Sequence, residues 1–210
     1  MQANASYRGI TVSGSATKKV AATSAQLTLN FYSLQQPKPN ATPGPALDET
    51  RLAPIIDAMV QAGVSRSDIS FPLGSRSDRN ATLVATVPNP TASQMQRGIS
   101  IVGSALDRMP ELSLNAQVQL QASNCGEVTD AVRGMAIANA REKAESVAKQ
   151  LGVHLGAVVN VVANDQVPPN GICQWQYGLG QGNPTQLGSP EDWVSVPVYS
   201  SVSITYAIKN

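Results

Sequence analysis

The sequence has few charged residues and almost no imbalance between their signs. Asp, Glu, Lys and Arg make up 14% of the 210 residues, and the formal net charge is +1, whereas soluble proteins carry about 25% charged residues. No run of Lys or Arg forms the basic surface that attracts nucleic acids or anionic membranes. We therefore expect no nucleic-acid partner. Ser, Thr, Asn and Gln supply the polarity instead, as is common among exported proteins.

Long apolar runs are also missing. No stretch approaches the ~18 apolar residues needed to span a bilayer, so we expect no membrane span. The first five residues, MQANA, lack the basic and apolar regions of a signal peptide. We interpret the chain as either cytosolic or already trimmed of a leader.

Residues that carry catalytic chemistry are scarce. His154 is the single histidine, and a cation near the end of a helix is favoured by the helix dipole, so we favour a structural role for it. The motifs HExxH, GxxxxGK[ST] and G-x-S-x-G are absent, and the acidic residues are scattered singly. We predict no enzymatic activity, no catalytic residues, no cofactor and no metal site.

Only two cysteines occur, Cys125 and Cys173. They are too few for a disulfide scaffold and lack zinc-ligand spacing. One disulfide in an oxidising compartment and two unrelated buried thiols are equal alternatives. A bridge would tie the loop around Cys173 to the start of the long helix described below. It would close about 50 residues and stabilise the fold by roughly 3 to 4 kcal/mol through restriction of the unfolded chain.

The order of predicted elements indicates an α+β fold. Apolar residues at helical spacing predict helices at about 50–62, 91–109 and 124–151. Alternating or β-branched residues predict strands at 9–20, 25–34, near 69, 81–87, 111–123, 157–163 and 193–207. The inner β-α-β-β-α-β run matches the split βαβ arrangement. We expect three helices covering one face of largely antiparallel sheets, in one domain over 1–210 or two lobes of about 1–122 and 123–210.

The long predicted helix carries a ridge of small residues. Its alanines stand four apart, which places them on one helical face suited to close packing against a sheet: Ala136, Ala140, Ala144 and Ala148. Charged residues between them exclude a small-xxx-small membrane motif. Asn124 and Glu127 have the spacing of a capping box at its start, and Gly152 ends it.

A loop rich in proline and glycine, residues 164–192, shows no periodicity of either kind. Trp175, Tyr177 and Trp193 lie in or beside it, among glutamines. They form either a surface that stacks on a sugar or anchors another subunit, or a cover over the sheet with the tryptophans in the core. We favour cover or subunit contact over ligand binding, because buried aromatics supply much of interface energy.

The segment from Ala136 to Gly156, with the pattern A-x3-A-R-x-K-A-x3-A-x2-LG-x-x-LG, resembles the SIMPL-domain family, which includes YggE-type bacterial proteins. The strand ITVSGSA and the run AGVSRSDIS extend the resemblance over nearly the whole chain. Family members are generally exported to the periplasm or cell surface, and one periplasmic antigen among them assembles into a large ring or channel-like oligomer. The family has no established enzymatic activity, and some members are linked to oxidative-stress defence.

The resemblance implies an exported, non-enzymatic protein, periplasmic or secreted after removal of its signal peptide. We expect it to act as a homo-oligomeric structural or interaction module of the cell envelope, with a link to stress defence. The alternative is a binding module that captures a glycan or small ligand through the loop from Trp175 to Trp193.

Overall fold

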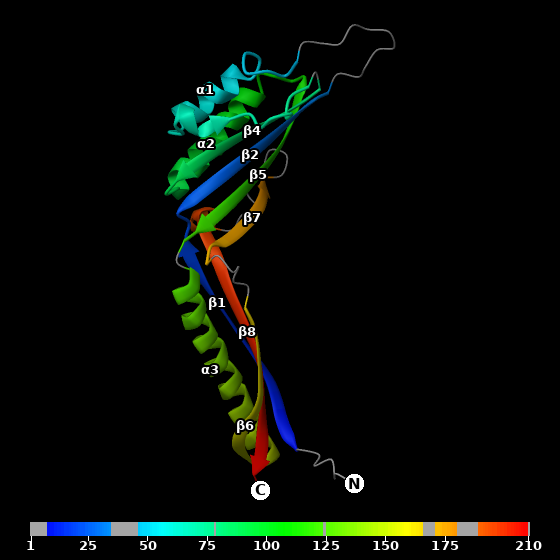
Figure 1. Ribbon diagram of the computed structural model, residues 1–210, viewed down its shortest axis with the longest axis vertical. Helices are drawn as coiled ribbons and strands as arrows, with labels where there is room; N and C mark the ends of the chain where they lie inside the picture. The colour runs from blue at the N-terminus through cyan, green and yellow to red at the C-terminus, as the bar shows by residue number, and fades with distance from the viewer. Residues whose placement is uncertain are drawn as a thin grey trace. The chain divides into compact units, whose positions relative to one another are not determined.

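The computed structural model describes residues 8–34, 46–77, 79–123, 125–165, 171–179 and 189–209. Within these ranges it contains three α-helices and eight strands in two antiparallel sheets, which confirms the predicted α+β class (Figure 1). The chain forms two compact units. The long-helix unit comprises Met1–Val20, Ser123–Cys173 and Pro197–Asn210, and the two-helix unit comprises Ala21–Ala122 and Gln174–Val196.

The units are interleaved along the sequence. One boundary lies after residue 122, the first 20 residues group with the later part of the chain, and 174–196 group with the earlier part. The chain therefore passes between the units four times.

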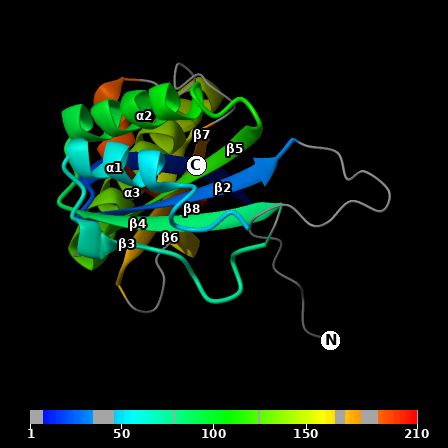
Figure 2. The same ribbon diagram turned by 90° about the horizontal axis from the view of Figure 1, so that it is seen from above.

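The two-helix unit is built on a five-stranded sheet. Its elements are β2 (Ser24–Ser33), α1 (Ala53–Gln61), β3 (Ile69–Ser70), β4 (Asn80–Pro88), α2 (Ala92–Leu106), β5 (Leu112–Ala122) and β7 (Cys173–Leu179), with short 3-10 helices at Arg66–Asp68 and Pro190–Val194. The strand order is β3-β4-β2-β5-β7, with β2 antiparallel to both β4 and β5. The order of β2 to β5 is that of the predicted split βαβ arrangement. Both helices cover one face of this sheet (Figure 2).

The core of the two-helix unit follows from alternation along the strands. Leu29 of β2 pairs with Leu83 of β4 and Ala116 of β5, and all three side chains are buried. The predicted helix ends are also confirmed. Thr91 accepts a hydrogen bond from the Gln94 amide at the start of α2, and Gly63 ends α1 with a φ of 94°.

The long-helix unit packs one helix on a three-stranded sheet. Its elements are β1 (Gly9–Ala21), α3 (Cys125–Leu151), β6 (His154–Asp165) and β8 (Ser195–Lys209), with strand order β1-β8-β6. Three alanines of the ridge, Ala136, Ala140 and Ala144, pack with side chains of β8, β1 and β6: Ile204, Tyr206, Val12, Ala16 and Leu155. Figure 1 shows α3 beside β1 and β8. This confirms the packing predicted for the ridge.

Two strands differ from the sequence prediction. β6 extends beyond the expected 157–163, and β7 lies in a stretch where we expected irregular structure. The prolines and glycines that flank β7 obscure its short alternation of Gln174 and Gln176 with Trp175 and Tyr177. Pairing with β5 stabilises the strand, and local sequence does not report that pairing. Asn124 of the predicted capping box and residues 180–188 lie outside the described residues.

Candidate functional site

The most exposed regular element is β6, an edge strand of the three-stranded sheet. None of its 12 residues is buried, whereas alternate residues of its neighbour β8 are buried. Four valines of β6 are between 46% and 56% exposed: Val158, Val159, Val161 and Val162. Contiguous exposed apolar residues on a sheet edge indicate an interaction surface, because such an edge is a template for pairing with another strand.

The valines of β6 lie on both faces of the sheet. Val161 pairs with buried Ile204 and so lies on the face covered by α3, whereas Val162 pairs with Ser203 on the opposite face. Two register shifts interrupt the pairing with β8, between Leu155 and Val158 and between Val158 and Asn160. Such irregularities bend a strand and re-aim its side chains.

Two main-chain groups of the other edge strand, β1, are already bonded to α3. Lys143 of α3 donates from Nζ to the Ser13 carbonyl of β1 at 3.0 Å, and the Ser15 amide of β1 donates to Asn139 Oδ1 at 3.3 Å. Lys18 adds an exposed charge to β1, and edge lysines oppose strand pairing. Of the two edges, β6 is therefore the one suited to pairing.

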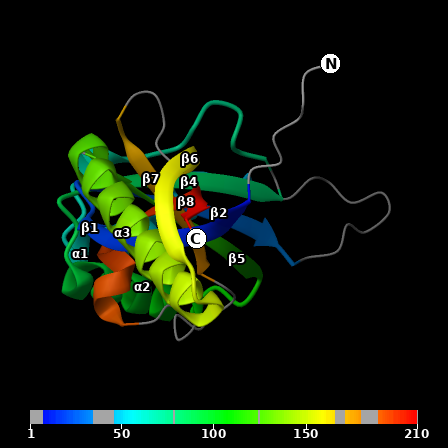
Figure 3. The ribbon, with the colours of Figure 1, turned by 90° about the horizontal axis from the view of Figure 1, so that it is seen from below.

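A groove of about 930 Å³ lies between α3, β6 and β8, within the usual size of ligand pockets. Figure 3 shows α3 and β6 side by side. Ile204 and Tyr206 of β8 contribute to its lining, with Ile137 of α3 and Val158 and Val161 of β6. The alanine ridge packs α3 on β1, β8 and Leu155 at the start of β6, whereas β6 beyond Gly156 stays mostly exposed.

Charged and polar side chains also line the groove, from Arg141 in the second half of α3 to His154 at the start of β6. Arg141 donates to Glu145 at 2.9 Å, and this hydrogen bond and ion pair raise the pKa of Arg141. Lys149 and His154 also line the groove, and among the described residues neither side chain has an ion-pair partner. The structure therefore places His154 on a groove wall.

The far end of β6 is anchored by Asp165. Its carboxylate accepts from Ser200 Oγ of β8 at 2.5 Å and from Arg133 Nε of α3 at 2.7 Å. The hydrogen bond from Ser200 and the interaction with Arg133 lower the pKa of Asp165 against the opposing effect of its desolvation. Arg133 also pairs with Asp130 at 2.8 Å. These contacts join α3, β6 and β8, so we assign them a structural role.

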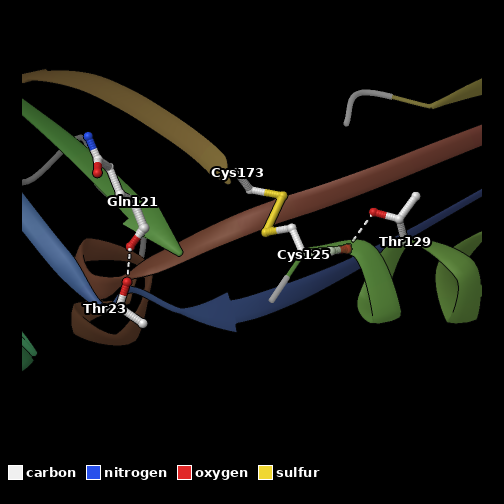
Figure 4. The surroundings of a disulfide bond; sticks show 5 residues. All are labelled: Thr23, Gln121, Cys125, Thr129 and Cys173. Atoms are coloured by element: carbon white, nitrogen blue, oxygen red, sulfur yellow. Dashed lines mark hydrogen bonds between the residues drawn. A yellow bond between two sulfur atoms is a disulfide. The ribbon is translucent and has the colours of Figure 1, made fainter. Parts of the chain in front are cut away.

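Cys125 and Cys173 form a disulfide with a Cα–Cα distance of 5.8 Å (Figure 4). The two cysteines lie at the ends of the segment that contributes α3 and β6 to the long-helix unit. Both are buried, and Thr129 Oγ1 donates to the Cys125 carbonyl at 2.7 Å within the first turn of the helix. The link closes the segment that carries the exposed edge and the groove.

Trp175, Tyr177 and Trp193, which we treated as one group in the sequence, differ in how far they are buried. Trp193 is buried, and Tyr177 is buried beside it and donates to the Trp193 carbonyl at 2.9 Å. Burial raises the pKa of the Tyr177 hydroxyl. Trp175 is 46% exposed. On the other face of β7, Gln174 accepts a hydrogen bond from Gln119 of β5, and Gln176 donates one to Gln117 of β5.

Sequence reasoning missed the exposed edge and the groove. The run of apolar residues in β6 predicted a strand and gave no sign of which faces would be covered. The two glycines that flank Val153 to Leu155, together with the four valines, were the available signal. Among the described residues, no group of His, Cys, Asp and Glu is placed to hold a metal ion, and no helix is long and apolar enough to cross a membrane.

The fold and the uncovered edge define a class of two-unit α+β protein, and comparison with known sequences identifies the family. Residues 10–186 match the SIMPL family, described as "Protein of unknown function (DUF541)". The chain belongs to the SIMPL family.

Two similar relatives are the 26 kDa periplasmic immunogenic proteins of Brucella melitensis biotype 1 and Brucella abortus (strain S19). Each is 25% identical over 199 residues, which cover 86% of this chain and 78% of the relative. A search of solved structures matches the regulatory subunit of aspartate kinase from Thermus flavus. That match has 14% identity and a TM-score of 0.28, and it covers 93% of this chain and 89% of that chain. At this TM-score we draw nothing from the structural likeness.

Proposed function

We propose that this protein is exported to the periplasm or cell surface and acts as a non-enzymatic, homo-oligomeric interaction module of the envelope, assembled through β6. The single observation that carries the assembly is the unburied edge strand with four exposed valines. Export is supported by the relatives, which are named periplasmic proteins. A disulfide between the two cysteines fits an oxidising compartment.

A second copy of the chain is the partner that best fits this edge. Because two main-chain groups of β1 are already bonded to α3 and β1 carries lysine, we favour the pairing of β6 with β6, related by a two-fold axis and antiparallel. It would join three strands from each copy into one sheet. Full burial of a valine is worth about 1.5–3 kcal/mol, so completing the burial of each half-exposed valine contributes roughly 1 kcal/mol. Each main-chain hydrogen bond adds about 0.5–1.5 kcal/mol.

The link to stress defence, implied by the family resemblance, belongs in this proposal to the assembled protein. The proposal includes no catalytic residues, since mainly apolar side chains line the groove and project from the exposed edge strand.

Light scattering after size-exclusion chromatography tests the assembly. We expect a mass that rises with concentration over the micromolar range, and a strictly monomeric protein would contradict the proposal. Val162→Lys should reduce association at least about tenfold, because a lysine on an edge strand opposes pairing with another strand. Ser203→Lys is the matched control, since it places the same charge one strand inward on the same face.

A second candidate is capture of a glycan or small ligand at β7, favoured by the exposed ring of Trp175. Tyr177 and Trp193 would support this site from within, because both are buried.

A further inference from the structure

We propose that the groove between α3 and β6 binds the acyl chain of a free long-chain fatty acid, with its carboxylate near Lys149 and His154. The proposal does not depend on assembly through β6. It rests on the length of the groove, its mainly apolar lining, and a lysine near one end that has no ion-pair partner among the described residues.

The groove is long, and most of the side chains that line it are apolar. It is lined along α3 from Ile137 to Gly152, and fifteen helical steps of 1.5 Å correspond to about 22 Å. Val158, Val161 and Ile204 also line the groove, and the two valines are about half exposed. An extended hydrocarbon chain fits such a groove, because it would bury these side chains without requiring a polar partner.

The other end of the groove has a positive character. Lys149 and His154 line it near the turn, and among the described residues no acid pairs with either side chain, whereas Arg141 is neutralised by Glu145. The carbonyls that end α3 would oppose an anion. However, the Lys149 carbonyl accepts from the Gly152 amide and the Ala148 carbonyl accepts from the Val153 amide, so both are already bonded. A carboxylate would supply the negative partner that the Lys149 ammonium lacks among the described residues.

Titration of the 15N-labelled full chain with laurate, myristate and palmitate, each below its aggregation limit, tests this inference by NMR. We expect saturable shifts at the amides of Gly152, Gly156 and Val158. The affinity should rise by about threefold to fifteenfold for every two added methylenes, since each buried methylene is worth at most about 0.8 kcal/mol. Tetradecyltrimethylammonium, which has a similar tail and the opposite charge, should bind at least about tenfold more weakly than myristate.

Variants separate the two parts of the site. Lys149→Glu should lower the affinity for myristate at least about tenfold, because it replaces attraction of the carboxylate with repulsion. Lys18→Glu makes the same charge change on β1, outside the groove. This variant should leave the affinity for myristate unchanged. Val162→Lys should also leave binding unchanged, because Val162 faces away from the groove. Failure of assembly is thereby distinguished from failure of the ligand site.

Three results would overturn the proposal. One is the absence of saturable shifts at the groove amides. Another is equal weakening by Lys149→Glu and Lys18→Glu. The third is a groove filled by a second copy, seen as concentration-dependent protection of Ile137 from hydrogen exchange together with no myristate binding.

Discussion

Close packing of α3 on β1 leads to a sharp prediction for Gly14→Ala. A Cβ atom added at Gly14 would lie 2.1 Å from the Ala136 carbonyl oxygen and 2.5 Å from the Ala140 amide nitrogen. Bringing the first contact out to 3.0 Å requires a movement of about 0.9 Å. Both atoms belong to the helix backbone, so rotation of a side chain gives no relief and the whole helix must move.

The expected loss is large for the addition of one methyl group. Overpacking typically lowers the free energy of unfolding by about 1–3 kcal/mol. Because the contacts of the added methyl group are with backbone atoms, we expect a loss of about 3 kcal/mol for Gly14→Ala. For a protein of this size, each kcal/mol lowers the melting temperature by about 2–4 °C, so we expect a fall of about 6–12 °C. Thermal unfolding followed by circular dichroism at helix wavelengths measures it. Adding Ala140→Gly should restore little, because the two closest contacts are to backbone atoms.

Gly134→Ala is the matched control. Gly134 lies in α3, and a Cβ atom there would meet nothing within 4 Å. Alanine is favoured over glycine inside a helix by about 0.5–1 kcal/mol, so this variant should melt slightly above the parent. The reasoning is refuted if Gly14→Ala melts within about 2 °C of the parent while Gly134→Ala behaves as expected.

Three further predictions concern the disulfide, the anchor of β6 and the exposed tryptophan. Replacing Cys125 and Cys173 with Ala should destabilise the protein by about 4 kcal/mol for the 48-residue separation, and two reactive thiols in the unreduced, denatured parent would contradict the link. Because its pKa is lowered on folding, Asp165 should contribute stability that is complete above about pH 4 and lost as the pH falls through the folded pKa. Asp165→Asn should therefore show a shallower loss of stability in acid, and equal acid melting profiles would argue against this role. Trp175→Ala should abolish binding on a glycan array without changing assembly, and an array on which the parent binds nothing would count against the second candidate function.

The sequence predicted the parts of the fold that depend on local periodicity. The alanine spacing of α3 gave both the helix and its buried face, and alternation in β2 and β5 gave two central strands with their inward residues. These features follow from repeats of 3.6 and 2 residues that are visible without any knowledge of neighbouring elements.

Features that depend on distant partners were not predictable in the same way. The alternation in β7 is short, and the strand forms because β5 offers an edge to it. The exposure of β6 depends on the position of α3. Gly14, on the opposite edge strand β1, lacks a side chain and so allows the helix backbone to lie close to β1. Likewise, Tyr177 and Trp193 looked equivalent to Trp175 in sequence, and burial distinguishes them.

Hydrogen exchange of the β6 amides, measured in dilute and in concentrated protein, tests the central claim most directly. Pairing of β6 with β6 of a second copy predicts that protection across His154–Asp165 rises with concentration, whereas protection in β8 stays constant. The same exchange rates in β6 at both concentrations, in a sample that light scattering finds assembled, would contradict assembly through this edge.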